Sequence, residues 1–90
     1  MKDKLLKIIQ HYGAVNQRKK LCEEFMELQD ELYNTYVLGN TFSDDLLSEI
    51  ADVLVLIFQF VVEYGFDTTD IENEMRFKIQ RQLDRISEEK

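Results

Sequence analysis

The 90-residue sequence predicts an all-α fold with a four-helix bundle-like arrangement, on three observations. Hydrophobic residues make up 44% and charged residues 32%, a composition typical of a folded domain and not of a disordered segment. No proline interrupts the chain, and three glycines punctuate it. Between the glycines, apolar residues recur at the spacing of an α-helix. We expect one domain over residues 1–90, with a core so thin that subunits share it.

The first two predicted helices are separated by Gly13. The first spans residues 3–12 and mixes lysine with leucine and isoleucine. The second runs from Ala14 to about Tyr36, followed by a connection at residues 37–42. Its apolar residues at helical spacing are Leu21, Phe25, Leu28 and Leu32.

The third predicted helix begins at Ser43 as the N-cap and ends at Tyr64, where Gly65 supplies the stop. Asp44 and Asp45 would lie in its first turn, where the helix dipole favours acids. Residues 53–62 are β-branched and aromatic enough for a strand, but the length and the caps favour a helix. Because this helix is apolar nearly all round, we expect it to be central.

The fourth predicted helix opens with a capping box, in which Thr69 is followed three residues later by Glu72. It continues to about Glu88. Apolar residues again recur at helical spacing along it. They are Ile71, Met75, Ile79 and Ile86.

Charge and composition exclude several classes of partner. The 11 basic and 18 acidic residues give a net charge of −7, which argues against a nucleic-acid backbone and an anionic membrane surface as partners. One cysteine, Cys22, and one histidine, His11, leave no internal disulfide and no zinc cluster. The most apolar run, residues 50–62, is about half the length that a bilayer requires. We expect a soluble, cytoplasmic protein with no signal peptide.

Two acidic motifs stand out, Glu23-Glu24-x-x-Glu27 on the second helix and Glu49-x-x-Asp52 on the third. Residues three or four apart share one face of a helix, so each motif sets carboxylates side by side. The first motif alone is equally typical of a solvated helix face. The second lies on the apolar helix, where burying carboxylates costs several kcal/mol unless a basic side chain or a metal compensates them.

The two motifs are expected to meet. If the apolar stripe of the second helix packs on the third helix, Glu24 and Glu27 lie at the seam and face Glu49 and Asp52. Four carboxylates without histidine form an oxygen-only site, which suits a hard cation such as Mg²⁺ or Mn²⁺.

Basic residues gather on one face of the fourth helix, at Lys78, Arg81 and Arg85. Beside a bound metal they would hold phosphate oxygens. They would equally offset the dipole at the carboxyl end of the helix and pair with surface acids, and the sequence leaves both interpretations open.

Together, the acidic motifs and their helical context resemble the MazG-like, all-α nucleoside triphosphate pyrophosphohydrolase superfamily. The likeness extends over about residues 10–86. It includes Gln17 and Lys20 ahead of the first motif, and residues 77–83 look like the last helix of short phage- and Firmicute-type members.

The resemblance implies an enzyme that hydrolyses a nucleoside triphosphate between its α and β phosphates, in nucleotide-pool house-cleaning. The products would be a nucleoside monophosphate and pyrophosphate. It implies Mg²⁺, or Mn²⁺, as the cofactor, and assembly into a homodimer or homotetramer. The implied metal ligands are Glu24, Glu27, Glu49 and Asp52. Glu23 or Glu27 would be the catalytic base, and the implied phosphate- and nucleotide-binding residues are Gln17, Lys20, Lys78 and Arg81.

Two alternatives stay open. A non-catalytic, acidic helical module for oligomerisation or nucleotide sensing would account for the helices. It would not explain why Glu49 and Asp52 lie on an otherwise apolar helix. Within the superfamily, phosphoribosyl-ATP, dUTP or dCTP would be other substrates. The phosphoribosyl-ATP branch is disfavoured, because its third helix typically carries Tyr-His after the Asp, where this chain has Val53-Leu54.

Overall fold

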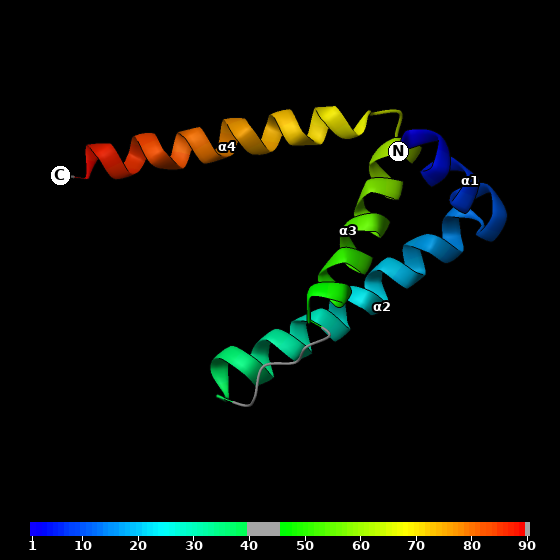
Figure 1. The fold of residues 1–90 in the computed structure, drawn as a ribbon, viewed down its shortest axis with the longest axis horizontal. Coiled ribbons are helices and arrows are strands. Elements are labelled where there is room, and N and C mark those ends of the chain that lie inside the picture. Colours follow the sequence, from blue (N-terminus) through cyan, green and yellow to red (C-terminus); the bar gives the residue numbers. More distant parts are fainter. Residues whose placement is uncertain (40–45, 90) are drawn as a thin grey trace.

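The computed structural model describes residues 1–39 and 46–89, and it is all-helical over both stretches. Its elements are α1 (Lys2–Tyr12), α2 (Ala14–Leu32), the π-helical segment η1 (Tyr33–Val37), α3 (Leu46–Glu63) and α4 (Thr68–Glu88). Figure 1 shows that α1, α2 and α3 pack together, whereas α4 projects away from them as an arm. The predicted all-α fold class is confirmed.

Helix α1 and the start of α2 lie close to the predicted residues. Gly13 separates them with φ 89°, a conformation that side-chain-bearing residues rarely adopt, and its N–H donates to the carbonyl of Ile9 at 2.8 Å. The end of α2 differs from the prediction, because the α-helical pattern stops at Leu32 and the π-helical η1 follows. There the Leu38 N–H bonds the carbonyl of Tyr33, five residues back, at 3.1 Å.

Helix α3 is helical throughout residues 53–62, so the alternative of a strand is excluded. Gly65 ends it as predicted, with φ 92°. The N–H groups of Gly65 and Phe66 donate to the carbonyls of Val62 and Val61, which is the Schellman arrangement. The predicted N-terminal cap, Ser43 with Asp44 and Asp45, lies outside the described residues, as do residues 40–42 of the predicted connection.

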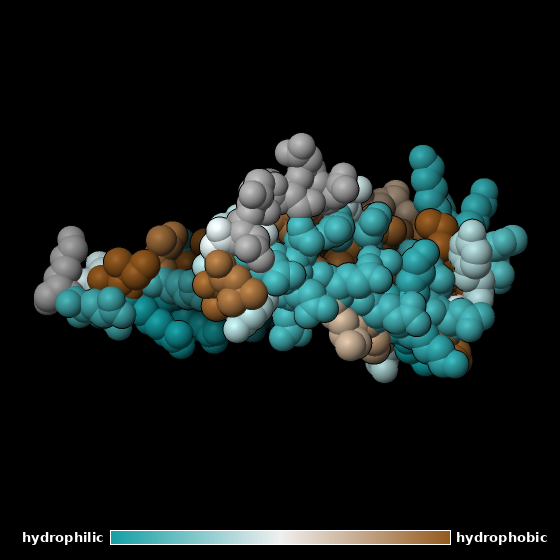
Figure 2. All heavy atoms as spheres, turned by 90° about the horizontal axis from the view of Figure 1, so that it is seen from below, coloured by the Kyte–Doolittle hydropathy of each residue, from teal (hydrophilic) through white to brown (hydrophobic). Residues whose placement is uncertain are grey.

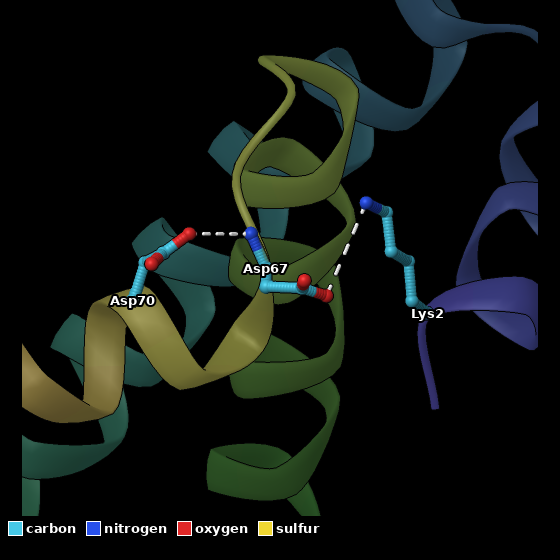
Figure 3. Close-up of polar contacts among 3 residues, drawn as sticks. All are labelled: Lys2, Asp67 and Asp70. Atoms are coloured by element: carbon cyan, nitrogen blue, oxygen red, sulfur yellow. Dashed lines mark hydrogen bonds and ion pairs between the residues drawn. The ribbon is translucent and has the colours of Figure 1, made fainter.

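The predicted capping box of α4 was wrong by two residues. The N-cap is Asp67, whose N–H donates to Oδ2 of Asp70 at 2.7 Å, and the Asp67 side chain accepts from the N3 backbone in return (Figure 3). A carboxylate caps a helix as well as a threonine hydroxyl does. Because Asp67 precedes Thr69 in the chain, the helix begins two residues earlier than predicted. The pair Thr69 and Glu72 therefore lies inside the helix.

The core is thin and centred on α3, as predicted. Its buried apolar side chains are Leu5, Leu46, Val53, Leu56 and Val62. The apolar stripe of α2 is only partly covered, since Phe25 remains 45% exposed and Leu32 38% exposed. At the edge of the helical cluster, the exposed ammonium of Lys2 lies 3.9 Å from Oδ1 of Asp67 (Figure 3), a weak contact between α1 and the start of α4.

The single chain does not close a four-helix bundle. Its radius of gyration is 16.3 Å and its extents are 50 × 34 × 19 Å, whereas a compact 90-residue domain has a radius of gyration of about 12 Å. The difference comes from α4, which projects from the other helices as an arm (Figure 1). None of its side chains is buried. Among the helices of residues 1–39 and 46–89, none is long and apolar enough to cross a membrane.

Candidate functional site

Helices α2 and α3 pack against each other and run in opposite directions (Figure 1). Polar contacts join them at one end of the surface where they meet. Nε2 of Gln17 donates to Oε1 of Gln59 at 2.8 Å, and Gln59 is buried, with 4% of its surface exposed. Next to this bond, Arg18 of α2 pairs with Glu63 of α3. A buried, hydrogen-bonded pair is costly to misalign, so these contacts set the register of the two helices.

The same register brings the acidic motifs together. Seven residues forward from Gln17 on α2 is Glu24, and seven residues back from Gln59 on α3 is Asp52. Seven residues are about two helical turns, so both steps return to the same face after about 10.5 Å. The Asp52 carboxylate acts electrostatically on Glu24, as this register requires.

Glu24 occupies an environment that disfavours its charge. Burial, then the neighbouring carboxylates of Glu27 and Asp52, raise the pKa of Glu24, and a side-chain hydrogen bond with Glu27 adds to the increase. Lys20, one turn earlier on α2, opposes these effects. The seam therefore concentrates negative charge that one basic side chain offsets only in part.

Glu49 lies one turn before Asp52 on α3, and in the same register it falls opposite Glu27. Glu49 is half-buried and its Oε2 atom is shielded from solvent, whereas Glu27 and Asp52 are exposed. The cluster thus has a shielded inner side and an open outer side. Glu23 is also exposed, next to Glu24 along α2.

The four predicted phosphate-binding residues fall into two groups. Gln17 and Lys20 lie on α2 beside the acids, although the side-chain amide of Gln17 is already bonded to Gln59. Lys78 and Arg81 are exposed on α4, which runs away from the crossing of α2 and α3 (Figure 1). A single chain therefore does not bring these two bases to the acidic cluster.

The carboxylate ligands are of the type that a divalent cation prefers, but their positions do not form a complete coordination site. Their donors are all carboxylate oxygens, and a bound cation would relieve the repulsion between Glu24 and its neighbouring carboxylates. As the side chains are placed, no three of the described His, Cys, Asp or Glu residues form a group that could hold a metal. Binding of Mg²⁺ or Mn²⁺ would therefore require these carboxylates to turn toward one another.

Sequence reasoning named Gln17 as a nucleotide-binding residue and did not predict that it aligns the site through Gln59. The Gln17–Gln59 bond joins residues 42 apart in the chain, and the Arg18–Glu63 pair joins residues 45 apart. No local sequence motif predicts such pairs. One signal was present, because Gln59 and Glu63 share the helix face that carries Glu49 and Asp52. A polar strip on an otherwise apolar helix indicates a polar partner across the seam.

Comparison with known proteins adds no relative to these observations. No protein-family model, no curated protein and no solved structure matches the chain. The likeness to the MazG-like superfamily is therefore carried by the motif residues alone and stays a prediction.

Proposed function

We propose that this protein is a Mg²⁺-dependent nucleoside triphosphate pyrophosphohydrolase of MazG-like type, which cleaves its substrate between the α and β phosphates. The observation that carries the proposal is that α2 and α3 both contribute acids to the surface where they meet. Acids from two different helices, Glu24 and Glu27 on α2 and Glu49 and Asp52 on α3, lie in one antiparallel register. A structural role gives no reason to align carboxylates that repel one another.

Electrostatics explain why such a cluster suits this reaction. A chain with a net charge of −7 repels a triphosphate unless cations intervene. Mg²⁺ held by Glu24, Glu27, Glu49 and Asp52 would neutralise the phosphate charge and lower the pKa of an attacking water. The side chain of Lys20, one turn from Glu24, would attract phosphate oxygens at the same edge.

A proton must leave the attacking water, and exposed carboxylates at the rim of the cluster can accept it. Glu27, one turn from Glu24, and Glu23, next to Glu24 along α2, are both exposed. We therefore assign the role of general base to one of these two residues. We assign Glu49 to holding the ion, because its Oε2 atom is shielded from solvent and so exchanges protons with water less readily.

The remaining predicted ligands, Lys78 and Arg81, require a second subunit. Because α4 leads them away from the acids of their own chain, they reach a phosphate only if another copy presents them (Figure 1). The proposal therefore includes a homodimer or homotetramer in which subunits share helices around the site.

The test is an assay of pyrophosphate release. The purified protein is incubated with each canonical triphosphate, and with modified ones, in the presence of Mg²⁺ or EDTA. We expect Mg²⁺-dependent release from at least one nucleotide, which Glu49→Gln abolishes and the matched change Glu72→Gln on α4 leaves intact. No release from any nucleotide by a folded protein would contradict the proposal.

The exposed arm of α4 favours one other function, that of a non-catalytic module for oligomerisation or nucleotide sensing. The same experiment separates the two functions. A sensing module would bind nucleotides in a calorimetric titration and release no pyrophosphate, whereas the enzyme would release pyrophosphate at each turnover.

A further inference from the structure

A groove of about 610 Å³ lies where α3 ends and α4 begins, at the turn that Figure 1 shows between the two helices. Its volume is within the range of about 300–1,000 Å³ that is typical of small-ligand sites. Hydrophilic side chains cover much of the face that Figure 2 shows, whereas this groove has apolar and aromatic walls. None of the four acids assigned to the metal site lines it, so it is a separate feature of the molecule.

Three aromatic side chains from the end of α3 and the turn after it form one wall of the groove. Phe60, Tyr64 and Phe66 line it and are 39%, 65% and 56% exposed, so much of each ring is open to a ligand. The ring centroids of Phe60 and Tyr64 lie 4.8 Å apart, with the planes tilted by 48°. The face of an aromatic ring attracts a cation and packs against methylene groups. This wall therefore favours a ligand that has an apolar body and a positive charge.

The first turns of α4 supply the polar wall, from Asp70, Asn73 and Glu74. All three side chains are exposed. Asp70 and Glu74 are four residues apart and share one face of the helix, which sets their Cβ atoms about 6 Å apart. No base is among the described residues that line the groove. Arg76, the next base along α4, donates to Oδ1 of Asn73 at 3.3 Å and does not line it.

The two carboxylates can accept hydrogen bonds from a ligand. Oδ2 of Asp70 accepts from the N–H of Asp67 at 2.7 Å in the capping box (Figure 3), and this bond leaves Oδ1 of Asp70 with its acceptor capacity. Within the described part of the chain, the Glu74 carboxylate makes no hydrogen bond or ion pair. The capping bond also holds Asp70 in place, so one of the two acceptors is positioned before a ligand arrives.

The two walls together decide the class of ligand. A phosphate would meet two carboxylates and no base, which disfavours a nucleotide. A bare metal ion prefers oxygen ligands, and the aromatic wall offers it none. An organic cation with an apolar body fits both walls, and the net charge of −7 attracts it to the protein.

We propose that this groove binds an aliphatic polyamine, a methylene chain that carries two or more ammonium groups. One ammonium group pairs with Asp70 and another with Glu74, while the methylene groups lie over the rings of Phe60 and Tyr64. A four-carbon chain sets two ammonium groups about 6 Å apart, which matches the spacing of the two acids on α4. The site does not depend on the proposed hydrolysis of a nucleotide, because it shares no residue with the acidic cluster.

Proton–nitrogen NMR spectra of the full chain test the site, with 1,4-diaminobutane as the probe and salt at about 0.15 M to screen non-specific attraction. We expect saturable shifts of the amide signals of residues 60–66 and 70–74. Uncharged 1,4-butanediol has the same carbon chain and should cause no such shifts. The shorter 1,2-diaminoethane should bind more weakly, because it does not span both carboxylates.

Matched variants test the two walls separately. Glu74→Gln should weaken binding of 1,4-diaminobutane about fivefold, whereas Glu72→Gln removes the same charge from the far side of α4 and should leave binding unchanged. Tyr64→Leu keeps an apolar side chain without the ring and should weaken binding about threefold. Circular dichroism checks that all three variants stay helical.

Three results would overturn the proposal. The first is the absence of saturable shifts in the wild-type protein. The second is a set of shifts centred on the acids of α2 and the first half of α3, since the diamine would then only collect at the densest negative charge. The third is equal binding to Glu74→Gln and Glu72→Gln. The release of pyrophosphate enters none of these measurements, so failure of the proposed enzyme activity would leave this test intact.

Discussion

Gln17 of α2 donates a hydrogen bond to Gln59 of α3 at 2.8 Å, two helical turns from Glu24 and Asp52, whose carboxylates repel each other. One polar pair therefore aligns the seam, and the carboxylates follow from that alignment. The consequence is that the geometry of the acidic cluster depends on a residue pair outside the acidic motifs.

Removing one member of this pair should destabilise the fold. In Gln17→Ala the buried amide of Gln59 loses its partner, at a cost of about 1–3 kcal/mol in the free energy of unfolding. The double variant Gln17→Ala/Gln59→Leu should recover most of that loss, because no buried polar group is left unsatisfied. Urea denaturation measures both. If the double variant were as unstable as the single one, the bond would not be the cause.

The stability of the metal-free protein should depend on pH through Glu24. Its pKa is raised in the folded state, so the folded protein binds a proton more tightly than the unfolded chain. The free energy of unfolding should therefore fall as pH rises from the ordinary glutamate range to the raised pKa, and stay level above it. Denaturation in EDTA at stepped pH values measures this.

Glu24→Gln should remove that contribution and stabilise the metal-free protein at neutral pH, because an amide carries no charge into the cluster. Glu88→Gln, an exposed change at the end of α4, serves as the control. A Glu24→Gln protein that lost stability in EDTA would show that the Glu24 carboxylate is not repelled.

Gly65 should resist substitution, because it sets the direction in which α4 leaves α3. Its φ of 92° strains any residue with a Cβ, although no atom lies within 4 Å of a Cβ placed there. Gly65→Ala should therefore cost about 1–2 kcal/mol through backbone strain alone. Gly65→Asn should cost less, since asparagine tolerates this region better. Equal stability of all three proteins in urea would contradict the assignment.

Mixed subunits should show whether two chains build each site. Glu49→Gln chains lack a cluster acid, and Lys78→Ala/Arg81→Ala chains lack the two bases of α4. Each should be inactive alone. After subunit exchange a mixed dimer holds one site with all its groups, so the mixture should regain about a quarter of the wild-type rate of pyrophosphate release. A mixture that stayed inactive would place these bases outside the site.

The helices could be predicted because their signals are local. Gly13 and Gly65 end helices through their own backbone, and apolar spacing identified α3 despite its β-branched residues. The start of α4 was misplaced because Asp67 with Asp70 offers the same chemistry as Thr69 with Glu72. Local sequence does not decide between two good caps.

The arrangement of the helices was less predictable. The periodicity of α4 showed that it has an apolar stripe, but not whether its own chain covers the stripe. The acidic motifs were visible in the sequence, yet the contact that aligns them joins residues 42 apart. Such pairings depend on how the helices pack, which residue spacing within one helix does not encode.

The most direct test of the account is a calorimetric titration of Mn²⁺ or Mg²⁺ into the metal-free protein and into two variants, Glu24→Gln on α2 and Asp52→Asn on α3. The account predicts saturable binding to the wild-type protein, with both variants losing it to a similar extent, because one ion needs both helices. Binding that persists in either folded variant, or no binding to the wild-type protein, would contradict it.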